Sequence, residues 1–489
     1  MAGGRRFGGL LRQRSFRLLW IGETISQLGN AMAVVGVPLV AVIVLHASTF
    51  VVGVLTAAAW LPWLLIGLPA GAWVDRLPAR RVMIACDVIS AVVYASVPAA
   101  AWAGVLTTGQ LVAASLLGGA ASVLFMTAYQ VYLPSLVKPD ELIEGNTKMQ
   151  GSASAALFAG PSLAGLVAQL LGAVTALLGN AVSFLVSAAC LVGTGPAGAG
   201  LVAAPRRAGL RRLKRRSAGP GSGGLRREIA DGLLLVLRDP FLRQLSTFWA
   251  VANLALTGYT ALLVVFLVRV IGLTPGSVGL LTAIPGIGGI LGAVLTGRIT
   301  TRLGTARGLL LSTLCAVPFG LLIPLTGPGL RLAFYVMGSL LAYTGIAVGN
   351  IIIAAFRQSY SPPGMCGRVT ATMRFLIFGT SPIGALLGGS LGTWLGVRNA
   401  LWVLLGAVAL SGTLLLTRAL TSGRDLPSVV GEARVPAPAA PADVTPGRPH
   451  ESLAHEALEP EGVQTEGGQS QGGQSQGGQS QGGQTGATD

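Results

Sequence analysis

Two acidic residues lie within long apolar stretches of the sequence, and they are the side chains there most able to do chemistry. Glu23 is the first. Gln27 and Asn30 follow it by four and seven residues, so the three share one face of a helix. A carboxylate facing lipid would be costly, and we therefore expect this face to line an internal cavity. There Glu23 could bind a cationic group or carry a coupling proton. Alternatively, it pairs with an arginine near the helix end and only stabilises packing.

Asp87 is the second acidic residue, about one turn into the third apolar stretch. It could titrate, or it could brace Arg80 and Arg81 in the preceding loop, and its place near the end of the stretch favours the brace. The other polar side chains that could line a cavity are Tyr129, Gln130, Asn253 and Asn350, each with interhelical hydrogen bonding as the alternative. Tryptophans in these stretches, including Trp60 and Trp63, are interpreted as interfacial or packing residues.

The sequence offers no pattern for metal or cofactor chemistry. Its four cysteines form no CxxC pair, and its three histidines cannot complete a metal site with them. No nucleophile–base pair occurs in the apolar stretches, and there is no GxxxxGK[ST] nucleotide-binding loop. We therefore expect no cofactor, no metal and no enzymatic activity.

Composition indicates a protein with many membrane spans. Of the 489 residues, 52% are hydrophobic and 11% are charged, whereas a soluble protein carries roughly 25% charged residues. A spanning helix needs roughly 20 apolar residues. Twelve stretches meet this need, at about 18–44, 50–72, 82–103, 109–134, 148–170, 173–194, 242–268, 276–297, 307–326, 331–355, 369–393 and 398–419. The predicted fold class is an all-α, multi-pass protein of the cell membrane with twelve transmembrane helices.

These stretches form two sets of six. The expected organisation is an N-terminal segment 1–17, a six-helix half 18–194, a basic central loop 195–241, a second six-helix half 242–420 and a disordered polar tail 421–489.

Basic residues predict the orientation in the membrane. All but three of the 34 Lys and Arg residues fall in the N-terminal segment, the even-numbered loops, the central loop and the tail; the exceptions are Arg269, Arg331 and Arg398. Because basic loops stay in the cytoplasm, both termini are expected there. The central loop could touch anionic lipid headgroups. It has no fold with which to present a helix to nucleic acid, so we expect no such partner.

An internal repeat relates the two sets of helices. The segments 52–81 and 278–307 align without a gap, with Val52 paired to Val278, and each runs from an apolar stretch into a short basic loop. Two related halves are common among secondary transporters. Asp75 of the first copy is replaced by Thr301 in the second, so a charge-based switch in this loop would belong to the first copy alone.

The loop GAWVDRLPARR at 71–81 resembles motif A of the major facilitator superfamily. The matching positions, with the basic residue that follows them, are Gly71, Asp75, Arg76, Arg80 and Arg81, while Pro78 stands where the family usually has glycine. The stretch LPSLVKPDELIEGNTKMQ at 133–150 resembles a bacterial exporter branch of this family, which includes the enterobactin exporter and macrolide-efflux-like permeases. The resemblance implies two six-helix halves and a latch in which Asp75 holds them together on the cytoplasmic side. The alternative is a solvated turn that only sets topology.

Gly160, Pro161 and Gly165 resemble motif C, which the superfamily associates with antiporters, although ordinary helix packing would also explain them. Many proton-driven members carry an arginine in the fourth helix, and the stretch LVAASLLGGAASVLF has none. This departure shifts the expected proton chemistry to Glu23 and Asp87.

Together these features predict a monomeric secondary transporter that exports a small amphipathic molecule, such as a drug, an antibiotic or a siderophore-like compound, by alternating access. Proton antiport is the expected driving force, because no nucleotide-binding loop is present. The alternatives are uptake, flipping of a lipid-like substrate, or a scaffold or sensor without transport activity. The expected partners are the substrate, protons and membrane lipids.

Overall fold

The computed structural model describes residues 9–74, 76–138, 141–194, 234, 237–360, 366–417 and 423–426, all within one compact unit, Met1–Val435. Twelve helical stretches among them are long and apolar enough to cross a membrane, which confirms the predicted number of spans. Most of the predicted central loop 195–241 and of the predicted tail 421–489 lies outside the described residues.

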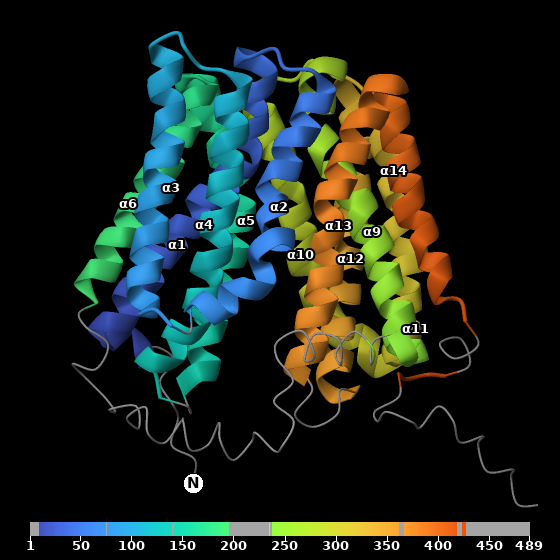
Figure 1. Ribbon diagram of the computed structural model, residues 1–489. Helices are drawn as coiled ribbons and strands as arrows, with labels where there is room; N and C mark the ends of the chain where they lie inside the picture. The colour runs from blue at the N-terminus through green and yellow to red at the C-terminus, as the bar shows by residue number, and fades with distance from the viewer. Residues whose placement is uncertain are drawn as a thin grey trace, which may run out of the picture. The chain divides into compact units, whose positions relative to one another are not determined.

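Two consecutive sets of helices form the bundle (Figure 1). The first set is α1 (Arg14–Leu39) with its π-helical extension η2 (Val40–Val44), α2 (Thr49–Val74), α3 (Ala79–Trp102), α4 (Thr108–Leu136), α5 (Leu142–Leu171) and α6 (Ala173–Gly193). The second set is α9 (Pro240–Val265) with η4 (Phe266–Val270), α10 (Pro275–Leu303), α11 (Thr305–Leu311) continued by η5 (Ser312–Ala316) and η6 (Val317–Leu325), α12 (Leu332–Tyr360), α13 (Cys366–Trp394) and α14 (Val397–Ser411) with η8 (Gly412–Leu415). They are called the first and second half below.

Several helices extend beyond the predicted apolar stretches. The third begins at Ala79 rather than about 82, because Pro78 adopts an extended conformation as the N-cap and helical geometry starts directly after it. The fifth begins at Leu142, and α12 continues to Tyr360. Hydropathy marks the length buried in hydrocarbon, whereas polar turns continue the same backbone hydrogen bonds past that boundary.

The internal repeat is also visible in the backbone. The π-helical turns η2 and η4 begin at Val40 and Phe266, which the offset of the sequence repeat makes equivalent. The helices that follow them, α2 and α10, begin at Thr49 and Pro275, and the same offset relates these two residues. A local irregularity of this kind occurring twice at one offset indicates that the two halves share one structural plan.

Glycines lie where the two halves cross. The halves meet mainly along α2 with α13 and α5 with α10. A Cβ atom added to Gly53 would lie 2.9 Å from the Cα of Gly389, and one added to Gly165 would lie 2.6 Å from the Cα of Gly279. Gly53 and Gly279 are equivalent in the repeat. The missing side chains thus allow two helix backbones to approach closely at related positions.

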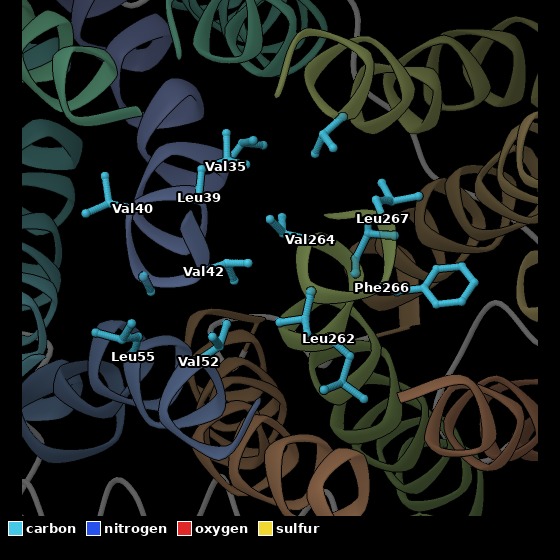
Figure 2. Close-up of a cluster of buried hydrophobic side chains, with 14 of the residues drawn as sticks. Val35, Leu39, Val40, Val42, Val52, Leu55, Leu262, Val264, Phe266 and Leu267 are labelled. Atoms are coloured by element: carbon cyan, nitrogen blue, oxygen red, sulfur yellow. The ribbon is translucent and has the colours of Figure 1, made fainter. Parts of the chain in front are cut away.

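The apolar core joins the halves at only one end of the bundle. The end of the bundle where α1 begins, with Arg76 just after α2 and Arg302 in the last turn of α10, is called the basic end, and the other end is called the distal end (Figure 1). At the distal end, side chains of α1, η2 and α2 share one buried cluster with side chains of α9 and η4 (Figure 2). At the basic end, the cluster around Phe16 and Met83 contains only first-half residues, and the cluster around Phe241 and Phe356 only second-half residues. Among the described residues, the halves therefore share a continuous core distally and have separate cores at the basic end.

Candidate functional site

A cavity of ≈ 330 Å³ lies inside the first half. Residues of α1, α2, α3, α4 and α6 line it. Glu23, Gln27 and Asn30 form part of the wall contributed by α1, as their helical spacing predicts, and Asp87 of α3 is also in the lining. The structure therefore brings the two membrane carboxylates of the sequence analysis into one cavity.

Glu23 is buried, with 7% of its surface exposed. Its Oε1 accepts a hydrogen bond of 2.7 Å from Nε2 of Gln27, one turn further along α1. Its Oε2 is buried without a hydrogen-bond partner among the described residues, which also provide no basic partner for this carboxylate. Among the described residues, Glu23 therefore forms no pair with an arginine, which was the alternative role predicted for it.

Asp87 lies deeper than the sequence suggested, because α3 begins at Ala79 and Asp87 is therefore two turns into the helix. Only 1% of its surface is exposed, and its Oδ2 has no hydrogen-bond partner among the described residues. The expected brace to Arg80 is wrong. Arg80 instead donates from Nε to the carbonyl of Leu191 at 2.9 Å and from Nη2 to that of Val192 at 2.7 Å, so it caps the last turn of α6.

Aromatic side chains complete the cavity wall, a role that was not predicted for them from the sequence. Trp60 and Trp63 of α2 line the cavity, and both rings pack on Phe378 of α13 with centroid separations of 5.5 and 5.1 Å. Tyr94 and Phe184 also line it and stack at 5.9 Å. Tyr94 follows Asp87 by seven residues, the same spacing that joins Glu23 to Asn30, and this periodicity could have identified it from the sequence.

Four predicted cavity residues are not in the lining of this cavity, although one of them, Asn253, lines a second pocket. Asn253 donates to the carbonyl of Ile377 at 2.8 Å and to the hydroxyl of Ser381 at 2.9 Å, so it joins α9 to α13. Tyr129 packs beside the apolar cluster of the first half at the basic end. Gln130 and Asn350 are exposed on the bundle. Of these four residues, Asn253 thus forms the interhelical hydrogen bonds that were the alternative to a cavity role.

A second, much smaller pocket of ≈ 40 Å³ occupies the equivalent place in the second half. Trp249, Asn253 and Thr313 line it, and the offset of the repeat makes each of them equivalent to a lining residue of the large cavity. Trp249 thus replaces Glu23, and Thr313 replaces Asp87. The repeat preserves the position of the pocket, but the second copy has no carboxylate and a bulky indole reduces its volume.

In the motif A-like loop, Asp75, the predicted latch residue, lies outside the described residues. Arg76 and Arg81 are exposed, and Arg80 caps α6 as described above. Gly71, within α2, has no described atom within 4 Å of an added Cβ. The latch therefore stays a prediction.

In the second copy of the repeat, the carboxylate of Asp425, from a distant part of the chain, contacts the equivalent loop. Thr301 occupies the position of Asp75, and its hydroxyl donates to its own helix backbone. Asp425 accepts from the backbone N–H of Thr305 at 2.8 Å, at the first residue of α11, and Arg424 donates to the carbonyl of Thr301 at 3.1 Å. The short segment 423–426 thus binds the loop between α10 and α11.

The motif C-like residues act in the structure as packing residues on both sides of α5. A Cβ on Gly160 would collide with Ala31 of α1, and one on Gly165 would collide with Gly279 of α10. Pro161 is buried between them. The packing alternative therefore explains these positions, and the antiport association stays a prediction.

The described residues contain twelve helices long and apolar enough to span a membrane, in two repeated halves, with a carboxylate-lined cavity inside one half; these are the features of a secondary transporter. Residues 19–382 match the Major Facilitator Superfamily, and the chain belongs to this family. It is thus a multi-pass membrane transporter and not an enzyme.

Two relatives of known sequence match most of the chain at low identity. The chain is 28% identical over 397 residues to the multidrug efflux pump Tap of Mycolicibacterium fortuitum, covering 78% of this chain and 91% of Tap. It is 26% identical over 374 residues to the uncharacterized MFS-type transporter y4rN of Sinorhizobium fredii (strain NBRC 101917 / NGR234), covering 76% of this chain and 87% of that protein.

Solved structures share the fold at lower identity. A bacterial homologue of the iron transporter ferroportin in an inward-facing state has a TM-score of 0.63 and 19% identity, covering 83% of this chain and 98% of that one. The nucleoside transporter NupG has a TM-score of 0.62 and 13% identity, covering 84% and 99%.

Proposed function

We propose that this transporter exports a small amphipathic molecule in exchange for protons. The observation that carries the proposal is the cavity in the first half, whose wall combines aromatic rings with the two buried carboxylates Glu23 and Asp87. An amphipathic molecule needs both kinds of surface. A relative that is 28% identical is a multidrug efflux pump, which supports export as the direction.

The arrangement of the cores supports loading from the basic end. The halves share an apolar core at the distal end and have separate cores at the basic end. With the basic loops in the cytoplasm, as the charge distribution predicts, this conformation is closed toward the outside. It is then the state in which an exporter takes up its substrate, and rocking of the halves would release the substrate distally.

Proton exchange follows from the position of the carboxylates. An acidic residue buried within a membrane span is costly as an isolated charge, and it is retained where protons or charged substrates pass. The one hydrogen bond that Glu23 accepts from the described residues comes from the amide of Gln27, and its other oxygen is available to hold a proton. Loss of that proton on the inside and its return from the outside would link the proton gradient to export.

The test uses everted membrane vesicles from an efflux-deficient host that expresses the full chain, in which respiration acidifies the lumen. A panel of fluorescent drugs is screened for accumulation that a protonophore abolishes. We expect accumulation with the parent protein and at least a tenfold lower rate with Glu23→Gln. Glu144→Gln is the matched control, since Glu144 is a carboxylate at the start of α5, 3.5 Å from Lys148 and away from the cavity.

Three results would contradict the proposal. Accumulation that persists without a gradient would exclude proton exchange. Substrate that leaves preloaded everted vesicles when the gradient is imposed would indicate uptake rather than export. A full rate with Glu23→Gln, at an equal amount of protein in the membrane, would remove Glu23 from the coupling step.

A further inference from the structure

We propose that the cavity of the first half is a site for a compact organic cation that carries aromatic rings, and that Glu23 and Asp87 bind its positive charge together. The inference rests on the proposed function only in that it takes this cavity as the transport site. It adds the substrate class, for which the charge, the aromatic wall and the volume of the cavity each provide an argument.

The cavity wall has acidic groups that no basic residue of its described lining compensates. Its lining contains two carboxylates and, among the described residues, no Lys, Arg or His. Glu23 and Asp87 are 7% and 1% exposed, and each keeps one buried oxygen without a hydrogen-bond partner among the described residues. Unpaired buried carboxylate oxygens are costly, and a cation placed between them would remove that cost.

The aromatic residues suit the rest of such a ligand. Trp60 and Trp63 come from α2, and Tyr94 and Phe184 from α3 and α6, so aromatic groups line the cavity from several helices. The face of an aromatic ring attracts a cation and also packs against flat apolar groups. A neutral lipid chain would gain little from the two carboxylates, and an anion would be repelled by them.

The volume favours a compact molecule. At ≈ 330 Å³, the cavity is at the lower end of the roughly 300–1,000 Å³ of small-molecule sites. A large siderophore or macrolide would exceed it in this conformation, whereas a drug-sized aromatic cation would fit. This narrows the substrate classes that the sequence left open.

The second half provides an internal comparison. In the equivalent pocket of ≈ 40 Å³, Trp249 and Thr313 stand where the first half has Glu23 and Asp87. The shared plan of the halves thus forms a pocket in both places, and only the first combines room with negative charge. The carboxylates are therefore not a requirement of the fold, and a ligand is a sufficient reason for their presence.

Two probes of equal shape and opposite charge test the inference. Binding of tetraphenylphosphonium and tetraphenylborate to the purified full-length protein in detergent is measured by equilibrium dialysis, with empty micelles subtracted. We expect saturable binding of tetraphenylphosphonium at one site, and none of tetraphenylborate. Glu23→Gln and Asp87→Asn should each weaken cation binding at least tenfold, whereas Glu144→Gln, outside the cavity, should leave it unchanged.

Conservative variants separate charge from folding. Glu23→Asp and Asp87→Glu keep the negative charge and are expected to bind the cation within a few-fold of the parent. If the neutral variants do not fold, the preference of the parent protein between the two probes decides. Equal saturable binding of both probes, or binding of neither, would overturn the inference.

The outcome can be distinguished from failure of the proposed function. If both neutral variants bind tetraphenylphosphonium as the parent does, yet lose gradient-driven accumulation, the carboxylates serve protons alone; the cation inference is then wrong and proton-coupled export stands. If cation binding depends on both carboxylates but no gradient-driven transport is found, the site is correct and the proposed export is wrong.

Discussion

Arg269 ties the two halves together at the distal end, and its removal is expected to open that end. Its Nη2 donates to the carbonyl of Ala47 at 2.7 Å and to that of Val42 at 3.4 Å. Arg269 belongs to η4 of the second half, whereas Val42 lies in η2 at the end of the first helix and Ala47 in the loop between η2 and α2. A cation is favourable at the C-terminus of a helix. In alternating access the distal end must open, and these bonds must then break.

The size of the effect follows from the geometry. A hydrogen bond with a charged donor contributes roughly 1.5–3 kcal/mol. Arg269 is exposed, which places the short bond to Ala47 at about 1.5 kcal/mol, because solvent screens such interactions. The longer bond to Val42 adds little. Since about 1.4 kcal/mol corresponds to a factor of ten, Arg269→Ala should raise the ratio of distal-open to distal-closed molecules about tenfold.

Spin labels across the distal end measure this ratio. Val105 and Leu330 lie in distal loops of different halves and are 64% and 96% exposed. Both would be labelled in a background with the native cysteines replaced, and pulsed dipolar spectroscopy should show a longer-distance population in Arg269→Ala. Arg398→Ala is the matched control, because Arg398 donates to the carbonyl of Thr326 at 3.0 Å within one half. An unchanged distance distribution in Arg269→Ala, or an equal change in both variants, would refute the reasoning.

Two further predictions concern packing and capping. Asp425→Ala removes the bond to the backbone N–H of Thr305, so amide exchange at the start of α11 should accelerate several-fold, as expected for loss of about 0.5–1 kcal/mol at a helix N-terminus; unchanged exchange there would contradict this contact. Gly165→Val places a branched side chain against the backbone of Gly279, and overpacking of this kind costs roughly 1–3 kcal/mol. Its melting temperature should fall by several degrees, whereas Gly151→Val, in the same helix with no described atom within 4 Å of an added Cβ, should melt like the parent.

The transmembrane helices could be predicted from apolar runs, and their ends could not. Hydropathy reports which residues avoid water, so it located all twelve spans. It carries no information about polar turns such as the first residues of α5 after Leu142, which remain helical outside the hydrocarbon. The position of the helix start also affects the role of Asp87. Because α3 begins at Ala79, Asp87 lies in the cavity and not near the surface, and the predicted brace to Arg80 is wrong.

Helical periodicity predicted the face of Glu23, Gln27 and Asn30, because it concerns one helix. Contacts between helices could not be predicted in this way, because they join distant parts of the chain. Arg269 was counted as one of three exceptions to the charge distribution, although it binds carbonyls of the other half. Nothing local to Arg269 signals this, because its partners Val42 and Ala47 belong to a distant part of the chain. The sequence favours an interfacial or packing role for Trp60 for the same reason, because whether its indole faces a cavity depends on four other helices.

The internal repeat correctly predicts which positions of the two halves are equivalent, but it does not predict the residue types found there. It correctly paired Asn253 with Gln27, and the structure places both in equivalent pockets. The two pockets nevertheless differ in size and chemistry, because Trp249 stands in the second pocket where the first has Glu23. Two halves with one plan must move against each other, and their helix crossings at Gly53 and Gly279 are accordingly alike. The acidic residues do not need to occur in both halves, because a single site in one half is enough to bind a ligand. The symmetry of the fold therefore indicates the moving parts, and the departures from that symmetry support the site that we propose.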